Sequence, residues 1–472
     1  MKKIIFFIIF FTSNILANDL PELGSSFDNV ISAAEEKKIR HQIMLQAFLS
    51  NSVIKDPEIN DYINDMGHEL IDKGINKKPE INFFIVNDSS INAFAMLGNI
   101  IGIHSGLILS ANSESELASV LSHEIAHITQ KHLLRLFDSQ AKNSYKTYFA
   151  LALALLVARS NPQLAQGVIT AGSASQVQNI LDYTRANERE ADRLGLEIMN
   201  KSGYDPKGFI DFFSSMQKFN IFVTGPSQSF LRTHPVTTER ISDIQDRLSD
   251  YKYVQKENKL EFYFVKSKLR AFIGDSFKVS ELFKSEIDTE SYINKAGAYY
   301  GLIYSLLRQE KTNEARLYFN ILDSMQINNP MIIELEARLL IQEEEYEKAF
   351  NVYKQGIKEF SYYRTFLYGI SELMIAANKN EEAISILKNY LTIFKNDYKI
   401  FELLAKAYNA KNEKLLEHES LSYAFYFQYN LQEAITQIDL AVRTDSKNFF
   451  DKSRVEYRLK ELKKESDLLY IQ

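Results

Sequence analysis

The 472-residue chain contains no cysteine and no tryptophan, few glycines and prolines, and no long apolar run. Without cysteine it forms no disulfide and offers no thiolate to a metal, so a metal site must use histidine and carboxylate ligands. The net charge of −6 lacks the basic excess that nucleic-acid binding requires. Hydrophobic residues make up 45% of the chain, as in folded proteins. At this length we expect two or three domains.

The first residues are typical of a bacterial secretory signal. Two lysines precede the apolar run Ile4–Phe11, and Ala17 follows where a cleavage site is expected. We therefore expect a signal peptide over residues 1–17, cleavage after Ala17 and a periplasmic protein, with peripheral association with the outer membrane left open. The alternative is an uncleaved anchor, although the run is far shorter than the roughly 20 residues that span a bilayer. The absence of cysteine after the cleavage site excludes a lipoprotein.

Residues 123–127 form an H-E-x-x-H motif. On a helix, His123 and His127 project from one face, so both imidazoles can bind one tetrahedral Zn²⁺. Glu124 would then lie beside the open coordination position of the metal. There it can act as general base for a water molecule and as proton donor to the leaving amine. The motif therefore predicts a zinc peptidase with one Zn²⁺ per chain.

The helix that carries this motif has a predicted start and a possible third ligand downstream. Ser113 and Glu116 fit a capping box, and the helical pattern continues to about Gln140. A later predicted helix supplies carboxylates, among which Glu188 and Glu190 are both candidates on spacing alone. Because a bare H-E-x-x-H motif also occurs by chance, this third ligand is needed for a metal site.

Two extended segments and one apolar run surround these helices. Residues 81–86 and 98–105 are predicted strands. The glycines of the second strand would let a peptide backbone approach and pair with it, which makes Gly98 and Asn99 candidate substrate-binding residues. An ordinary bulged edge strand is the alternative. The apolar run 148–158 is too short to span a bilayer, and we expect a buried helix rather than one that dips into a membrane surface.

From about Glu261 onward, amphipathic helices follow one another with short polar breaks. Ala315, Ala349 and Ala383 recur every 34 residues, each with a larger apolar side chain four residues later. This period is typical of tetratricopeptide (TPR) repeats, with an irregular further unit near Ala405. A plain helical bundle is the alternative. The predicted fold is mainly α: a signal peptide over 1–17, an α+β zinc metallopeptidase domain with a small sheet over 18–255, and a TPR-like α-solenoid over 256–472.

Several motifs occur in the order seen in the HtpX-like gluzincin peptidases, a family of zinc metalloendopeptidases that this chain resembles. They are Asn92-Ala93-Phe94-Ala95, Gly98-Asn99, His123 to His127, Asn187 to Gly195 and Thr233-His234-Pro235. The leading segment 20–24 and the trailing repeats resemble the periplasmic, repeat-carrying members of the family. The resemblance covers nearly the whole chain after the predicted signal.

The resemblance assigns roles that spacing leaves open. It implies that Glu188 binds Zn²⁺, that Asp192 orients a zinc histidine through its other ring nitrogen, and that Glu190 is a solvated surface charge. On spacing alone His234 is a loop histidine. The resemblance implies instead that it lies at the metal, where it either closes the open position in a resting state or stabilises the transition state. We expect His132 to be structural or exposed, and the same holds for His104.

The resemblance also implies a biological role. It predicts an endopeptidase that degrades stalled or misassembled outer-membrane proteins and docks through its repeats on the β-barrel assembly machinery. The alternative is a chaperone or assembly adaptor that acts through the solenoid surface without proteolysis. A helical scaffold with an accidental motif is a third reading. Glu124 favours the peptidase, because an adaptor has no use for a general base.

Overall fold

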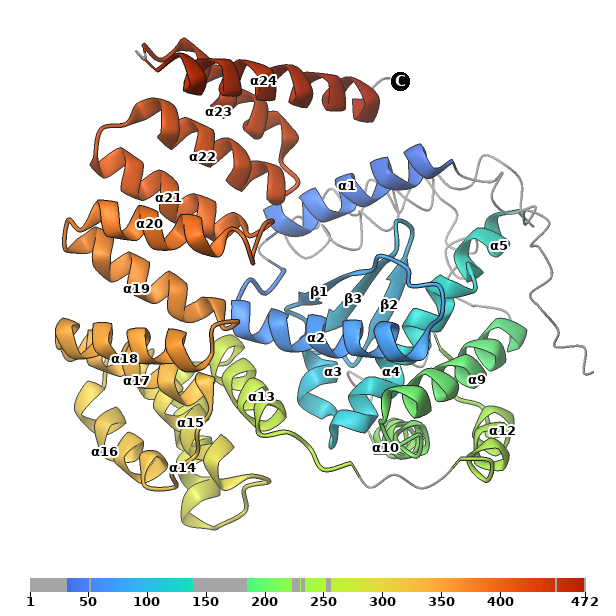
Figure 1. Ribbon diagram of the computed structural model, residues 1–472. Helices are drawn as coiled ribbons and strands as arrows, with labels where there is room; N and C mark the ends of the chain where they lie inside the picture. Colours follow the sequence, from blue (N-terminus) through green and yellow to red (C-terminus); the bar gives the residue numbers. More distant parts are fainter. Residues whose placement is uncertain are drawn as a thin grey trace, which may run out of the picture.

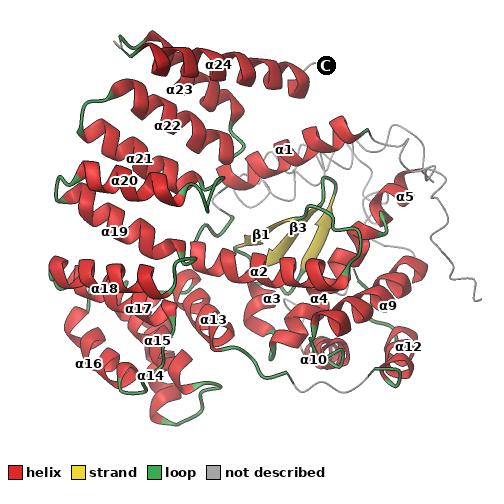
Figure 2. Cartoon of the chain, viewed as in Figure 1, coloured by secondary structure: helices red, strands yellow, loops and turns green. Residues whose placement is uncertain are grey.

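The computed structural model describes residues 32–50, 52–138, 185–222, 230, 234–251, 256–445 and 448–470. A small sheet with its covering helices forms the N-terminal part, and an arc of helices runs along one side of it (Figure 1). Figure 2 shows how few strands stand among the helices. The predicted signal peptide (1–17) and the apolar run 148–158 lie outside the described residues. Within the described ranges, no helix combines the length and the apolar character needed to cross a membrane.

The sheet has three strands in the order β1-β3-β2. They are β1 (Asn82–Val86), β2 (Ala93–Met96) and β3 (Ile100–His104). β3 pairs in parallel with β1 and antiparallel with β2. Gly98 and Asn99 have positive φ angles, 82° and 56°, and form the tight turn between β2 and β3.

The predicted pairing of a substrate with the strand at 98–105 is therefore wrong. That segment begins with a turn and continues as β3, whose two sides are both taken by neighbouring strands. A middle strand has no unpaired backbone groups to offer to a peptide. On this side of the described sheet, the outer edge belongs to β2.

Helices cover both faces of the sheet. On one face, α1 (Ala33–Leu49) packs Ile39 and Ile43 against Phe84 and Ile100. On the other face lie α2 (Pro57–Gly74) and α4 (Glu114–Thr129). The N-cap of α2 is Asp56, and its carboxylate accepts hydrogen bonds from two backbone N–H groups of the first turn. Because successive side chains of a strand point to opposite faces, each strand contributes to the hydrophobic clusters on both faces of the sheet.

The motif helix α4 differs from its prediction at both ends. The Ser113 hydroxyl caps the Glu116 N–H, but the Glu116 carboxylate accepts from the Asn112 N–H, so only half of the predicted capping box forms. The helix ends at Thr129 and not near Gln140. Lys131 adopts a left-handed conformation (φ 53°), which breaks the helix, and α5 (His132–Asp138) starts in a new direction.

Among the described residues of the N-terminal part, three further helices surround the motif helix, together with the short α3 (Ser105–Ser110). They are α9 (Arg185–Ser202), α10 (Gly208–Phe222) and α12 (Thr238–Leu248). α9 crosses α4, and α10 packs against the N-terminal end of α4, where Gly208 stands so close to the Ser115 carbonyl that a Cβ atom would lie 2.4 Å from its oxygen. α12 carries Arg240 and follows the segment with His234.

The C-terminal part is a solenoid of antiparallel helices, which confirms the predicted mainly α fold. Its helices are α13 (Leu260–Ile273), α14 (Ser276–Asp288), α15 (Lys295–Leu307), α16 (Thr312–Asp323), α17 (Pro330–Gln342), α18 (Tyr346–Glu359), α19 (Arg364–Ala376), α20 (Asn380–Tyr390), α21 (Tyr398–Ala410), α22 (Lys414–Phe427), α23 (Leu431–Arg443) and α24 (Phe449–Tyr470). A left-handed residue marks the turn within successive helix pairs every 34 residues, at Glu310, Glu344, Asn378 and Asn412.

The alanines that revealed the repeat are fully buried between helices. Ala315, Ala349 and Ala383 each lie in the second helix of a pair, where a small side chain lets the helices approach closely. The pairing becomes irregular after α22, because Tyr429 forms another left-handed turn only 17 residues after Asn412. The predicted irregular unit near Ala405 is still in register, because α21 and α22 turn at Asn412, and the irregularity begins one helix later.

The solenoid and the N-terminal part share one hydrophobic core, which runs from Ile54 to Leu339. Charged side chains are buried at the joint. The Lys268 ammonium on α13 contacts Asp56 at 2.7 Å and also binds Glu58 on α2. Tyr363 donates a hydrogen bond to Glu58. Burial raises the pKa of Glu58 to about 7, although Lys268 favours its charged form. The predicted domain boundary after residue 255 stays a prediction.

Candidate metal centre

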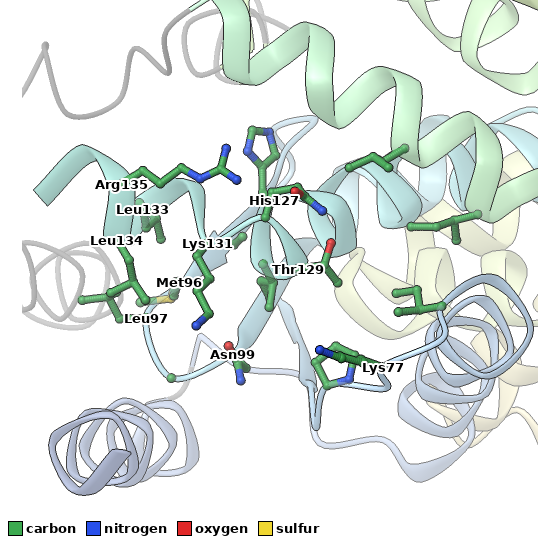
Figure 3. Close-up of a pocket in the computed structure, with 18 of the residues that line it drawn as sticks. Lys77, Met96, Leu97, Asn99, His127, Thr129, Lys131, Leu133, Leu134 and Arg135 are labelled. Atoms are coloured by element: carbon green, nitrogen blue, oxygen red, sulfur yellow. The ribbon is translucent and has the colours of Figure 1, made fainter. Parts of the chain in front are cut away.

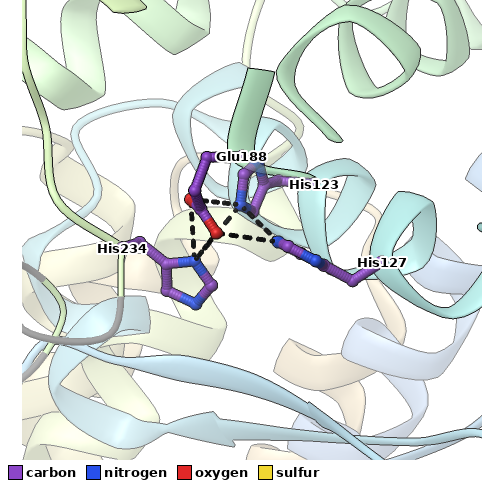
Figure 4. A group of neighbouring side chains, drawn as sticks. All are labelled: His123, His127, Glu188 and His234. Carbon is purple, nitrogen blue, oxygen red and sulfur yellow. Dashed lines mark hydrogen bonds and ion pairs between the residues drawn. The ribbon is translucent and has the colours of Figure 1, made fainter. Parts of the chain in front are cut away.

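Four side chains converge at a buried point between α4 and α9 (Figure 4). His123 and His127 lie one turn apart on α4, Glu188 comes from the first turn of α9, and His234 comes from the segment before α12. Their ligand atoms all lie within 4.8 Å of one another, and all four residues are buried. The structure thus brings together three residues predicted as ligands and the histidine predicted to lie at the metal.

The separations between these atoms fit a tetrahedral metal ion. His123 Nε2 lies 3.0 Å from His127 Nε2, and Glu188 lies 3.5 Å from the first nitrogen and 3.4 Å from the second. His234 Nδ1 lies 3.3 Å from His123 Nε2. Zn²⁺ with bonds of about 2.0–2.1 Å holds its tetrahedral ligands about 3.4 Å apart. The donor set therefore matches zinc without rearrangement of the helices.

A glycine allows the two helices of the site to meet at this distance. A Cβ atom on Gly195 of α9 would lie 2.8 Å from the ring of Phe209 and 3.3 Å from the backbone nitrogen of His123. Ala191, one turn earlier on the same face, is fully buried. Small residues at the crossing thus bring Glu188 within reach of the α4 histidines.

Asp192 and Arg240 contact the residues of the cluster and fix their orientation. Asp192 Oδ1 lies 3.0 Å from His123 Nδ1, the ring nitrogen that faces away from the cluster. Arg240 donates two hydrogen bonds of 2.7 Å to Asp192, and its third nitrogen lies 2.9 Å from Glu188 and donates to the Pro235 carbonyl. No spacing rule singles out Arg240 in the sequence, because its partners lie on another helix.

Glu124 is buried beside the cluster. Among the described residues, neither of its carboxylate oxygens accepts a hydrogen bond. His234 Nε2 lies 3.4 Å from its Oε1. A buried carboxylate without hydrogen bonds is unusual in folded proteins and commonly marks a functional position.

His132 was predicted to be structural or exposed and Glu190 to be a solvated surface charge, and both lie next to the cluster. His132 is fully buried, and its Nδ1 lies 2.8 Å from Nδ1 of His127, so it belongs to the surroundings of the site. Glu190 is not a solvated surface charge. Its carboxylate lies 3.2 Å from His132 Nε2 and accepts a 2.9 Å hydrogen bond from Arg135. The break in the helix at Lys131, which the sequence pattern did not reveal, brings His132 to this place.

The surroundings shift the pKa values of the buried groups of the cluster in different directions. Burial favours neutral His123, yet hydrogen bonds with Asp192 and Glu188 outweigh burial and raise its pKa to about 10. Burial lowers the pKa of His127 well below its usual value. Burial also opposes ionisation of Glu188, but His234, His123 and His127 hold its pKa well below the usual range. The site therefore keeps the buried Glu188 carboxylate ionised, which suits a divalent cation.

A groove of about 930 Å³ lies next to His127 (Figure 3). It is lined by the turn between β2 and β3 with Gly98 and Asn99, by the end of α4, by the start of α5 and by parts of α1 and α9. The predicted substrate-binding residues therefore border a groove that reaches a predicted metal ligand. Their part in binding stays a prediction.

Comparison with known proteins agrees with this site. Residues 57–248 match the profile of peptidase family M48. The matched segment contains the sheet and the helices that bring the candidate metal centre together, and the helical repeats follow it. Over 449 residues it is 26% identical to the β-barrel assembly-enhancing protease of Escherichia coli, covering 95% of this chain and 92% of that protein. The protein of the same name from Yersinia pestis is 27% identical over 389 residues, which are 82% of this chain and 80% of that protein.

The comparison with solved structures gave matches of low identity and low TM-score. YrrB, described as a TPR protein with an unusual peptide-binding site, is 15% identical and has a TM-score of 0.29, covering 41% of this chain and 95% of that chain.

Proposed function

We propose that the chain is a zinc-dependent metalloendopeptidase in which His123, His127 and Glu188 bind the metal. The observation that carries this proposal is the convergence of these three side chains at tetrahedral separations, with Glu124 beside them. Zinc bound there would supply Lewis acidity, which acidifies a water molecule and polarises a peptide carbonyl.

Glu124 is proposed as the general base. It takes a proton from the attacking water and later passes it to the leaving nitrogen of the peptide. Its carboxylate is free of hydrogen bonds to the described residues, so no protein donor competes for its lone pairs. The Asp192 carboxylate lies 3.0 Å from Nδ1 of His123, which favours a hydrogen on this nitrogen and leaves Nε2 to bind the metal.

His234 is proposed to restrain the enzyme. Its Nδ1 faces Glu188 and His123, on the side where a water or a substrate carbonyl would have to approach. A resting site closed by His234 predicts that His234→Ala raises proteolysis of an unfolded substrate. A role in stabilising the transition state predicts a loss instead, and unchanged proteolysis would exclude both roles.

The substrate class follows from the shape of the site and from the relatives. An extended peptide can pair with the outer edge of β2 and enter the groove beside His127, which favours unfolded chains over folded ones. The relatives are named for β-barrel assembly. We therefore propose a periplasmic enzyme, exported by residues 1–17, that degrades misassembled outer-membrane proteins and docks on the β-barrel assembly machinery through its repeats.

Metal content and proteolysis of purified protein test the proposal together. Wild type should contain one zinc per chain and degrade casein. Glu188→Gln should lose the metal, whereas Glu124→Gln should keep it and lose activity. Glu239→Gln, at an exposed position of α12, is the matched control and should keep both.

The other results are equally informative. Zinc without casein degradation in both wild type and His234→Ala would favour the chaperone or adaptor reading. Absence of zinc from wild type would exclude the catalytic proposal.

A further inference from the structure

We propose that His132 is a positioning residue that fixes the tautomer and orientation of His127. The inference rests on the proposed metal site. Its basis is a line of three side chains from three helices: His127 on α4, His132 on α5 and Glu190 on α9. Arg135, one turn after His132, binds the same Glu190 oxygen and holds the far end of this line.

The hydrogen bonds can be arranged in one consistent way. The Glu190 carboxylate can only accept, so His132 Nε2 carries the hydrogen that faces it at 3.2 Å. A neutral His132 then has a lone pair on Nδ1. His127 Nδ1, at 2.8 Å, must therefore be the donor in this contact. A neutral His127 that carries its hydrogen on Nδ1 presents the lone pair of Nε2 to the cluster, as a metal ligand requires.

The two metal histidines are thus oriented by different means. His123 faces the carboxylate of Asp192 directly. His127 faces another imidazole, and the carboxylate stands one step further away. His132 is fully buried, so water does not compete for its Nδ1. The helix break at Lys131 turns α5 so that His132 lies behind His127, which a continuous helix would not achieve.

Zinc affinity separates positioning from mere packing. We would compare wild type, His132→Leu and His132→Asn by competition with a chromophoric chelator, and record the thermal melting of each metal-free protein. Leucine fills the space without an acceptor, whereas the amide oxygen of asparagine can take the place of Nδ1. Loss of such a partner typically weakens metal binding by about 10- to 100-fold. We expect this loss in His132→Leu and near wild-type affinity in His132→Asn. His68→Leu, on the exposed side of α2, is the control.

Each outcome is decisive. If wild type binds zinc and His132→Leu binds it equally tightly, the inference is wrong while the proposed function stands. If wild type binds no zinc, both the inference about His132 and the proposed function are wrong. Equal losses in the leucine and asparagine variants, with lowered melting of the metal-free proteins, would mean that His132 only packs. Should His132→Leu fail to fold, Glu190→Leu tests the same line from its partly exposed end and should also weaken zinc binding.

Discussion

Arg240 shows how one residue can hold several parts of a site. Its guanidinium binds both oxygens of Asp192, approaches Glu188 and donates to the Pro235 carbonyl in the segment that carries His234. Planar bidentate contacts of this kind depend on the fork of arginine, which lysine cannot reproduce. Burial of the side chain means that water cannot replace these bonds when they are lost.

We predict that Arg240→Met lowers the free energy of unfolding of the metal-free protein by about 3–5 kcal/mol, because two buried carboxylates lose their cation. Arg240→Lys should recover only part of this loss. Urea denaturation measures both effects. Arg189→Met is the control, since Arg189 forms an exposed pair with Glu239. Equal stability of the Arg240→Met and Arg189→Met variants would contradict the prediction.

The lowered pKa of Lys266 should make the stability of the protein depend on pH. Burial lowers its pKa to about 8, although its ammonium donates to the Ala111 carbonyl. Between this value and the usual lysine pKa, the unfolded chain binds more protons than the folded chain, so stability due to this group rises with pH. We expect wild type to gain about 2 kcal/mol relative to Lys266→Met between pH 8 and pH 10. Denaturation series at both pH values measure the difference, and a constant difference would disprove it.

At the scale of single residues, the sequence predicts the position of a side chain where the geometry of one helix determines it. The spacing of His123, Glu124 and His127 is set by the turn of one helix, and the structure places all three as that spacing requires. Spacing could not choose between Glu188 and Glu190, because that choice depends on where α9 crosses α4. His132 could not be placed either, since the left-handed Lys131 has no sequence signal.

At the scale of elements, the crossing of α4 and α9 is the critical contact. Gly195 lies where the helices come closest, with the His123 backbone on one side and the Phe209 ring on the other. The ring can move, but the backbone cannot move without His123. Close packing of helices at a glycine thus connects the stability of the crossing to the geometry of the metal site.

We predict that Gly195→Val lowers the free energy of unfolding by about 1–3 kcal/mol and weakens zinc binding, because the added methyl groups push α9 away from α4. Gly195→Ala should have a smaller effect of the same sign. Melting and chelator competition measure the two quantities. Glu197→Val, at an exposed position of the same helix, controls for the cost of a β-branched residue. Unchanged zinc affinity in Gly195→Val would show that the crossing does not set the site.

The elements themselves were predictable to different degrees. The 34-residue period identified the solenoid, because each repeat buries the same small residue at the same crossing. The order of the strands was not predicted, because β1 pairs with β3 and not with β2, the strand that follows it in the sequence. The expectation of an open strand at 98–105 failed for this reason.

For the whole molecule, the joint between α2 and the solenoid is the central feature. Lys268 is fully buried between Asp56 and Glu58, Tyr363 closes Glu58 from the other side, and apolar side chains of both parts form one core around them. A buried ion pair surrounded by a shared core resists separation of the two parts.

We predict that Lys268→Met lowers the free energy of unfolding by about 3–5 kcal/mol, since two buried acids lose their cation. Adding Glu58→Gln should restore part of the loss, because one of the unpaired charges is removed. Lys348→Met, at an exposed pair in the solenoid, should change little. Denaturation followed by probes in both parts should show one shared transition in wild type. Separate transitions in wild type would contradict the role of the joint.

The joint also imposes an order in time on the making of the protein. Glu58 meets Lys268 210 residues later and Tyr363 305 residues later. During synthesis from the N-terminus, residues 123–127 are therefore made long before Lys268 and Tyr363, which contact α2. Until α13 has been made, Asp56 and Glu58 in the N-terminal part lack Lys268, the cation that they contact in the folded protein. The joint around α2 can therefore form only after the first helices of the solenoid have been made.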